Sequence, residues 1–203
     1  MSVRTRLNLN VPALQIDPQL LLRAQDVQVA FFDVDGVLTD GSLYIGDPLG
    51  SQQDGGVANS ARETLKRFHT LDGHGLKMLQ RAGITPAIIS GRDSPALRSR
   101  IQALGIRNAH FGQEDKRPLA ERTLGELGLD WSQAAAMGDD WPDLPVLQRA
   151  AVSCAPPGAH LEVRARVDYI TDKPAGHGAV RQWCDLLLTA RGHYARLLQE
   201  YLQ

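Results

Sequence analysis

The sequence predicts an α/β fold, with a parallel Rossmann-like sheet that carries helices on both faces. Apolar runs of strand length alternate along the chain with stretches of helical period, which is typical of a parallel sheet covered by helices. Clusters of polar residues directly follow several of these runs, as expected at the strand ends where open α/β sheets bind ligands. The length of 203 residues suits one domain, so we expect residues 1–203 to form a single unit.

The expected elements follow one another in a regular order. Asp17 and Pro18 supply an N-cap and a first-turn proline for a short leading helix. Strands are expected at residues 27–32, 84–89, 134–137, 151–155 and 168–171. Helices are expected at residues 72–81, 94–104, 118–127, 144–150 and 178–190.

One segment interrupts this alternation. Residues 42–45 and 64–70 are expected to form the two strands of a hairpin, an insertion at about 41–70. Residues 46–63 separate the two strands and are rich in Gly, Ser, Asp and Gln. That connection is long for a hairpin loop, so we expect it to be either mobile or ordered by a partner.

The composition argues against several classes of protein. The chain has 22 basic and 23 acidic residues and a formal net charge of −1, so no surplus of positive charge favours nucleic-acid binding. The six histidines form no pair with zinc-site spacing, and two cysteines are too few for a disulfide framework. No apolar run approaches the ~20 residues of a membrane span, and no signal peptide is apparent, so we expect no membrane partner and a cytoplasmic location.

Two carboxylates follow the first expected strand. Asp33 and Asp35 lie at positions i and i+2, so in an extended chain they share one face while Val34 points into the core. Two carboxylates at the end of a buried strand repel each other unless a cation or a proton lies between them. One of them then suits nucleophilic attack and the other proton transfer, although a turn with solvated acids fits the same residues.

Three further polar groups follow later strands. Asp139 and Asp140 supply the oxygen ligands that Mg²⁺ prefers. Ser90 offers a hydroxyl before a helix N-terminus, which suits a phosphate, and Lys116 offers a point charge for the same ligand. Each group taken alone also fits an N-cap or a surface charge. Their shared position at strand ends is the reason to consider them together.

The segments that carry these residues resemble the haloacid dehalogenase superfamily of aspartyl phosphatases, and within it the 3-deoxy-D-manno-octulosonate 8-phosphate phosphatase family. The resemblance covers residues 27–192, nearly the whole chain, and implies a capless fold with a β-hairpin extension. Asp33 and Asp35 match the first motif of the superfamily, Ser90 the second, Lys116 the third, and Asp139 with Asp140 the fourth. The family segments are FFDVDGVLTDG at 31–41, DGHG at 72–75, IISGR at 88–92, MGDDWPDLP at 137–145 and GAVRQWCDLLL at 178–188.

The resemblance implies a magnesium-dependent phosphatase that works through an aspartyl-phosphate. Asp33 would attack phosphorus, and Asp35 would protonate the departing sugar oxygen and then deprotonate a water. Ser90 and Lys116 would hold the phosphoryl oxygens. The metal would be bound by Asp33, Asp139 and the main-chain carbonyl of Asp35. Behind these ligands, Asp140 would support the metal site.

The resemblance also implies the substrate contacts and the assembly. A small phosphorylated sugar acid would be the substrate, and the chain would form a homotetramer in which a neighbour covers the site. Residues 192–203 would add to that cover, although a frayed helix fits them equally well. The family's substrate contacts fall on Asp35, His69, Thr70, Leu71, Asp72, Gly73, Lys77, Arg92, Arg100 and Lys116.

Three departures from the family pattern concern the substrate rather than the chemistry. Leu71 stands where the family often has arginine, and Lys77 stands where arginine is common. The Gly-Gly-Arg-Gly of many members is Ala-Gly-His-Gly at 175–178. The hairpin loop is also longer than usual. Cationic contacts to a substrate carboxylate are therefore fewer than the family pattern provides.

Other functions stay open at this point. The substrate can be a related 2-keto-3-deoxy sugar acid such as a nine-carbon 9-phosphate, or the enzyme can be a promiscuous phosphatase. A non-catalytic regulatory module of the same fold is a further alternative, against which the presence of Asp33, Asp35, Lys116 and Asp139 argues. A phosphomutase would need a cap that excludes water, and no insertion of that size occurs.

Overall fold

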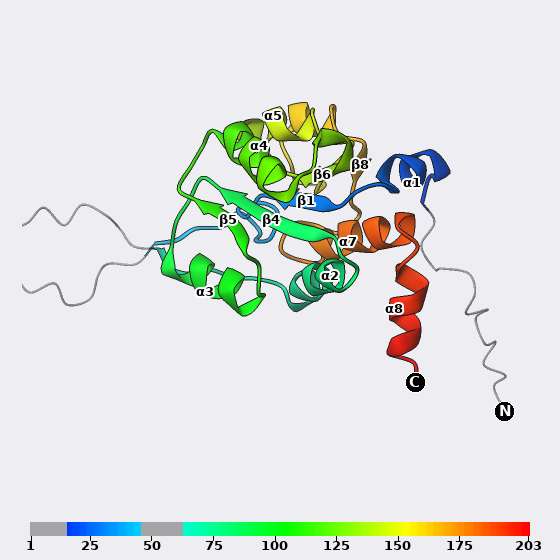
Figure 1. The fold of residues 1–203 in the computed structure, drawn as a ribbon. Helices are drawn as coiled ribbons and strands as arrows, with labels where there is room; N and C mark the ends of the chain where they lie inside the picture. The colour runs from blue at the N-terminus through cyan, green and yellow to red at the C-terminus, as the bar shows by residue number, and fades with distance from the viewer. Residues whose placement is uncertain (1–15, 46–62) are drawn as a thin grey trace, which may run out of the picture.

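Six parallel strands form the central sheet, in the order β5-β4-β1-β6-β7-β8 (Figure 1). The computed structural model describes residues 16–45 and 63–203. Within them, β1 lies between β4 and β6, so the segment after β1 emerges at the middle of the sheet edge. The strands are β1 Val29–Phe32, β4 Thr85–Ser90, β5 Asn108–Phe111, β6 Ala134–Met137, β7 Val152–Ala155 and β8 Tyr169–Ile170.

Helices cover both faces of the sheet. Figure 1 shows α4 and α5 on one side and α2, α3 and α7 on the other. The helices of the first side are α4 Lys116–Leu127, α5 Leu144–Leu147 and α6 Leu161–Arg164. Those of the second side are α1 Pro18–Ala24, α2 Thr70–Arg81, α3 Pro95–Ala103, α7 Ala179–Ala190 and α8 Tyr194–Glu200.

The side chains of β1 show how the two faces are filled. Val29 and Phe31 pack into the core under α4 and α5, whereas Ala30 and Phe32 pack into the core under α2 and α7. All four are buried, and full burial of each large apolar side chain stabilises the fold by about 1.5–3 kcal/mol. A strand buried on both faces explains the uninterrupted apolar run that the sequence shows.

The predicted fold class is confirmed. The six-stranded sheet contains all five expected strands, with ends that differ by at most two residues, within the usual uncertainty of element boundaries. The short leading helix is also present, and the Asp17 side chain accepts a hydrogen bond from the Gln19 N–H. Among the strands and α-helices of the described residues, the edge strand β5 and the one-turn helix α6 had not been expected. The two short 3-10 helices, Trp131–Gln133 and Trp141–Asp143, had not been expected either. The expected helix at 144–150 ends early, at Leu147.

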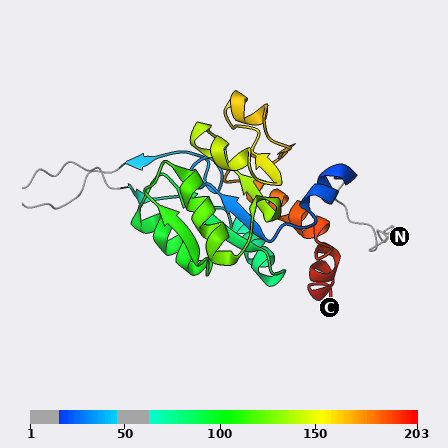
Figure 2. The same ribbon diagram turned by 45° about the horizontal axis from the view of Figure 1, so that its top comes forward.

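The hairpin is shorter than expected. It consists of β2 Tyr44–Ile45 and β3 Glu63–Leu65, paired antiparallel, instead of strands at 42–45 and 64–70. The second prediction was wrong beyond Leu65, because Thr70 already begins α2 and His69 caps that helix. The expected long connection lies at 46–62, outside the described residues. Figure 2 shows the cyan strand β2 at the end of the molecule opposite to α8.

The C-terminal residues form helix α8 and pack on the same chain. Leu197 is buried, and Arg81 of α2 donates a hydrogen bond to the Tyr201 hydroxyl at 3.0 Å. The Tyr201 ring also contacts the His74 ring edge to face.

None of the helices that the structure describes is both long enough and apolar enough to cross a membrane.

Candidate active site

Asp33 lies at the carboxyl end of the central strand β1. Its backbone N–H donates a hydrogen bond to the Met137 carbonyl at 3.0 Å, so the ladder between β1 and β6 continues one step beyond the strand and holds Asp33 in place. The next turn passes through Gly36, whose φ is +82°. A Cβ there would lie 2.1 Å from the Asp139 Oδ2 atom. Only glycine therefore allows the Asp139 carboxylate to lie against this turn.

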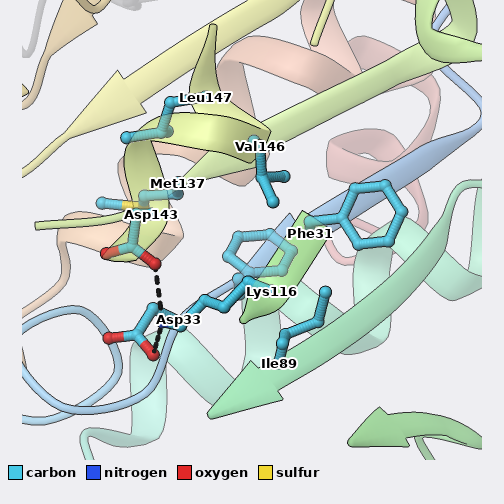
Figure 3. A pocket seen from close by; sticks show the side chains of 10 residues that line it. Phe31, Asp33, Ile89, Lys116, Met137, Asp143, Val146 and Leu147 are labelled. Carbon is cyan, nitrogen blue, oxygen red and sulfur yellow. Dashed lines mark hydrogen bonds and ion pairs between the residues drawn. The ribbon is translucent and has the colours of Figure 1, made fainter. Parts of the chain in front are cut away.

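Lys116 connects two of the carboxylates. It is the first residue of α4 and is 6% exposed. Its Nζ donates hydrogen bonds to Asp33 Oδ1 and to Asp143 Oδ1, both at 2.6 Å. Figure 3 shows apolar side chains around the three charged groups. Because these side chains keep water away, the ion pairs are screened much less than pairs on the surface. The labelled apolar side chains are Phe31, Ile89, Met137, Val146 and Leu147.

Asp143 is the site residue that the sequence interpretation missed. Its Oδ2 atom accepts hydrogen bonds from the Asp139 N–H at 2.9 Å and the Asp140 N–H at 3.2 Å, while Oδ1 accepts from Lys116. A Cβ on Gly138 would lie 2.4 Å from the Asp143 side chain, so a glycine is needed for the loop to fold back. The available signal was a third carboxylate four residues after Asp139 in the same motif.

The carboxylates offer a binding site for a divalent cation. Oxygen atoms of Asp33, Asp139 and Asp143 lie within 4.8 Å of one another. Both oxygens of Asp143 and Oδ1 of Asp33 already accept hydrogen bonds. Across 16–45 and 63–203, no hydrogen-bond donor is found for the Asp139 carboxylate, whereas the Val34 N–H also interacts with the Asp33 carboxylate. Carboxylate oxygens that accept no other hydrogen bond are hard ligands, and they fit Mg²⁺.

The charge balance of the site also favours the binding of a divalent cation. Burial raises the pKa of Asp33 to about 7, and the charge of Asp143 adds to this rise although Lys116 opposes it. Burial likewise raises the pKa of Asp139 to about 8, with further contributions from Asp33 and Asp143. Three carboxylates thus face one ammonium, and a divalent cation beside them would favour their ionised forms.

Lys116 itself stays charged. Burial disfavours its ammonium, but the carboxylates of Asp143 and Asp33 outweigh that cost and raise its pKa above the usual value. A permanently charged, doubly bonded ammonium suits a role as a fixed electrostatic partner for a phosphoryl group. It does not suit a role as a proton donor.

A cleft of about 600 Å³ opens above these groups. Ser90 ends β4 beneath it and is 1% exposed, and its Oγ atom accepts a hydrogen bond from the Arg92 N–H at 3.1 Å. The hydroxyl proton remains available for a ligand. The cleft thus brings together Asp33, Asp35, Lys116, Asp139 and Asp140, with Asp143 in addition, whereas Ser90 is not among the residues that line it. The cleft is lined by Asp33, Asp35, Gly91, Arg92, Glu114, Lys116, Asp139, Asp140, Pro142 and Asp143.

The other expected sugar contacts lie elsewhere in the described part of the chain. His69, Thr70, Leu71, Lys77 and Arg100 do not line this cleft. The first three lie at the start of α2, where His69 Nδ1 accepts a hydrogen bond from the Leu71 N–H. Leu71 and Lys77 are exposed, and the Arg100 guanidinium lies 5.8 Å from the centre of the Phe68 ring. A bound sugar would have to extend from the cleft to reach them.

Asp72, which was expected to contact the substrate, instead forms hydrogen bonds within the protein. It is 1% exposed, and its two oxygens accept hydrogen bonds from the Gly178 N–H at 3.2 Å and the Arg181 N–H at 2.8 Å. Asp72 therefore joins α2 to the N-terminus of α7, where a negative charge is favourable. A Cβ on the neighbouring Gly73 would lie 2.2 Å from Arg100 Nη2. This close approach explains the glycine at that position.

The fold and the site together indicate the superfamily to which the protein belongs. The central strand ends in an aspartate, a buried lysine begins a helix beside it, and an acidic cluster there could hold a metal ion. A solved structure described as a hydrolase of the haloacid dehalogenase superfamily matches this chain with 37% identity and a TM-score of 0.80. More narrowly, the chain belongs to the 3-deoxy-D-manno-octulosonate 8-phosphate phosphatase family. No protein-family model matches the chain.

Three relatives illustrate the similarity. The chain is 35% identical over 177 residues to the 3-deoxy-D-manno-octulosonate 8-phosphate phosphatase of Salmonella typhimurium, which covers 87% of each chain. The same enzyme of Haemophilus influenzae is 37% identical over 170 residues, or 84% of this chain and 87% of that one. The Moraxella catarrhalis phosphatase, solved with a magnesium ion, a phosphate ion and a KDO molecule, is 33% identical with a TM-score of 0.80. That match covers 90% of this chain and 98% of the Moraxella chain.

Proposed function

We propose that this chain is a Mg²⁺-dependent phosphatase that removes phosphate from 3-deoxy-D-manno-octulosonate 8-phosphate, a precursor in lipopolysaccharide synthesis. One observation supports the chemistry above all others. The Asp33 carboxylate lines the cleft, and its Oδ1 atom accepts a hydrogen bond from the buried Lys116 at 2.6 Å. A carboxylate fixed in this way is oriented for attack on a phosphorus atom in the cleft.

The first step transfers the phosphoryl group to Asp33. A carboxylate oxygen of Asp33 forms a bond to phosphorus, and the bond between phosphorus and the sugar oxygen breaks. The electron pair stays on the sugar oxygen, which takes a proton from Asp35. Lys116 and the Ser90 hydroxyl hold the other phosphoryl oxygens during the transfer.

The second step returns Asp33 to its starting state. A water oxygen attacks phosphorus and gives its proton to Asp35, and the bond between phosphorus and Asp33 breaks. Inorganic phosphate leaves, Asp33 regains its carboxylate, and Asp35 is again protonated for the next cycle. Asp33, Asp139 and the Asp35 main-chain carbonyl, with Asp140 behind them, would hold Mg²⁺, which would neutralise charge on the phosphoryl oxygens. Asp143 keeps Lys116 and the Asp139 loop in position.

Recognition of the sugar acid is assigned to the start of α2 and its surroundings. His69, Thr70, Leu71 and Gly73 are proposed to contact the sugar, whereas Asp72 is assigned to holding α2 against α7. Cations from other elements complete the proposed set, namely Lys77, Arg92 and Arg100. Leu71 removes one cation from this set compared with the usual family pattern.

A substrate panel tests this function. Purified protein with Mg²⁺ is assayed against 3-deoxy-D-manno-octulosonate 8-phosphate, the nine-carbon 9-phosphate and glucose 6-phosphate. We expect kcat/KM for the first substrate to exceed that for glucose 6-phosphate by at least about tenfold, or ~1.4 kcal/mol, and we expect EDTA to abolish turnover. Equal values for the two would favour a promiscuous phosphatase. Full activity in EDTA would refute the metal dependence.

We also propose a homotetramer that works in the cytoplasm. In support of the assembly, the hairpin exposes four large apolar side chains, Leu43, Tyr44, Ile45 and Leu65, which are 40–68% exposed. Closed symmetric oligomers are common among soluble proteins. Light scattering is expected to give a mass of four chains, and Ile45→Asp is expected to lower that mass. A fully active monomer would contradict the proposed assembly.

A further inference from the structure

The chain has four lysines, and two of them are buried beside the two carboxylates of the first motif. Lys116 holds Asp33, as described above. Lys66, which follows β3 directly, is 8% exposed, and its Nζ donates a hydrogen bond to Asp35 Oδ1. Lys77 and Lys173 are exposed. Burying an ammonium group is costly unless it is paired, so the position of Lys66 calls for a specific partner, and Asp35 is one.

Lys66 approaches Asp35 from behind the cleft. The Lys66 side chain is 1% exposed, whereas the Asp35 side chain is 21% exposed and lines the cleft. Lys66 does not line the cleft. It therefore contacts Asp35 on the side away from the phosphate position, and a direct contact between its ammonium and the phosphate is not indicated.

The two oxygens of Asp35 consequently have different surroundings. Oδ1 accepts the hydrogen bond from Lys66. Oδ2 lies 3.8 Å from the Nε atom of Arg92, whose side chain is 52% exposed at the cleft. An ion pair of that length is weaker than a hydrogen-bonded one and leaves the oxygen accessible. One oxygen is tethered by a hydrogen bond, and the other is held only by the longer ion pair.

We propose that Lys66 is a positioning residue for the proton-transfer step. By holding Asp35 Oδ1, it fixes the rotation of the carboxylate and leaves Oδ2 as the atom that gives a proton to the sugar oxygen. The same atom then accepts the proton of the attacking water. This inference rests on the proposed role of Asp35 as general acid and base.

The size of the expected effect follows from the role. General acid catalysis contributes about 10²–10⁴-fold to a rate, and a displacement of about 1 Å can cost about 10²-fold. Loss of the tether leaves Asp35 present but free to rotate. We therefore expect Lys66→Met to lower kcat/KM for the sugar phosphate by about 10–100-fold, less than the loss caused by Asp35→Asn.

A comparison of leaving groups tests the proposal. The parameter kcat/KM reports the steps up to cleavage of the bond between phosphorus and the leaving oxygen. The sugar alkoxide needs a proton to leave, whereas the phenolate of p-nitrophenyl phosphate leaves well without one. Lys66→Met is therefore expected to lower kcat/KM for 3-deoxy-D-manno-octulosonate 8-phosphate, but to change it by less than about threefold for p-nitrophenyl phosphate.

Arg67→Met provides a matched control. Arg67 is the next residue, and it is exposed and lies 3.4 Å from Asp40. The substitution removes one positive charge from the same segment without touching Asp35, so both substrates are expected to behave as with the wild-type enzyme. Lys66→Arg keeps the positive charge on a side chain of different length. We expect this variant to retain part of the activity that Lys66→Met loses. It also provides the same two-substrate measurement if Lys66→Met does not fold.

The outcomes separate this inference from the proposed function. An equal loss with both substrates would contradict the positioning role and indicate a structural one. If Lys66→Met leaves kcat/KM unchanged for both substrates while Asp35→Asn is inactive on the sugar phosphate, the positioning role is contradicted. The proposed function then remains intact. Full activity of Asp35→Asn on the sugar phosphate would instead overturn the proposed function.

Discussion

Two regions meet at Asp35 and are built in different ways. The carboxylate edge consists of Asp33, Lys116, Asp139 and Asp143, which come from separate elements and are buried or half-buried against one another. The hairpin side consists of β2, β3 and residues 68–73. Tyr44, Ile45 and Leu65 of this region are 40%, 68% and 60% exposed. One region is completed by contacts within the chain, whereas the other presents apolar surface outward.

The difference separates chemistry from recognition. Groups that transfer a phosphoryl group must be fixed to within a fraction of an ångström, and the sheet with its buried ion pairs provides that rigidity. Groups that select a sugar need only enclose it, and a surface of exposed side chains can be completed by the ligand or by a neighbouring chain. We therefore expect substitutions at the carboxylate edge to affect every substrate, and those on the hairpin side to affect specificity or stability.

The largest expected effect is that of Asp33→Asn at the carboxylate edge. Loss of the nucleophile is expected to lower kcat by at least about 10³-fold with both the sugar phosphate and p-nitrophenyl phosphate. Asp115→Asn is the control, because Asp115 is exposed and its side chain makes no capping hydrogen bond. Steady-state kinetics with both substrates checks this. Substantial residual turnover in Asp33→Asn would remove the basis of the comparison.

Asp143→Asn is expected to have the next largest effect. Its carboxylate holds Lys116 and the backbone of the Asp139 loop, so we expect kcat to fall by about 10²-fold through misplacement of these groups. The exposed Asp140 is expected to matter less, and Asp140→Asn serves as the comparison. Steady-state kinetics of the two variants under saturating Mg²⁺ shows which substitution causes the larger loss of kcat. A larger loss in Asp140→Asn would contradict the role of Asp143.

A more moderate effect concerns the pH dependence of metal binding. The raised pKa values of Asp33 and Asp139, about 7 and about 8, mean that the folded metal-free chain binds more protons than the unfolded chain. Its free energy of unfolding therefore falls as pH rises from about 4 to about 8. Because Mg²⁺ must displace these protons, its stabilising effect should grow with pH.

Thermal unfolding with Mg²⁺ and with EDTA measures this dependence. We expect the gain in Tm from Mg²⁺ to be greater at about pH 8 than at about pH 6 by about 2–4 °C, which corresponds to ~1 kcal/mol in a protein of this size. The same series on Asp139→Asn should show a smaller gain. A gain that is independent of pH in the unaltered chain would show that protons and metal do not compete for these carboxylates.

The smallest expected effect lies on the hairpin side, at Asp72. Its carboxylate accepts two backbone hydrogen bonds from the start of α7, so Asp72→Asn is expected to lower the free energy of unfolding by about 1–2 kcal/mol. Urea denaturation measures this change. For p-nitrophenyl phosphate we expect kcat/KM to stay within about twofold of the wild-type value. A loss of catalysis equal to that of Asp143→Asn would erase the distinction between the two regions.

The residues that the sequence interpretation identified are those with a local signal. Asp33 and Asp35 follow an apolar run and share a face by their spacing alone, so both were recognised. Asp143 and Lys66 were missed because their roles depend on partners 27 and 31 positions away in the chain. No local pattern distinguishes such a lysine from the exposed Lys77.

The secondary structure shows the same division. The fully buried strand β6 was predicted with its correct ends. The edge strand β5 was missed because Asn108 and His110 give a half-buried strand a polar composition. The second hairpin strand was extended too far, because the start of α2 was not recognised in the sequence. The side chain of His69 caps α2, and a histidine cap is not a usual sequence signal.

The most direct test of the central claim is detection of the phosphoryl group on Asp33. The Asp35→Asn variant is mixed with p-nitrophenyl phosphate and Mg²⁺, quenched in acid and digested, and its peptides are analysed by mass spectrometry. Since water activation is lost while the leaving group needs no acid, the adduct should accumulate. The account predicts a base-labile phosphoryl group on the peptide that contains Asp33, absent when Asp33 is also replaced by Asn. Release of p-nitrophenol without any adduct, or with the adduct on another peptide, would contradict it.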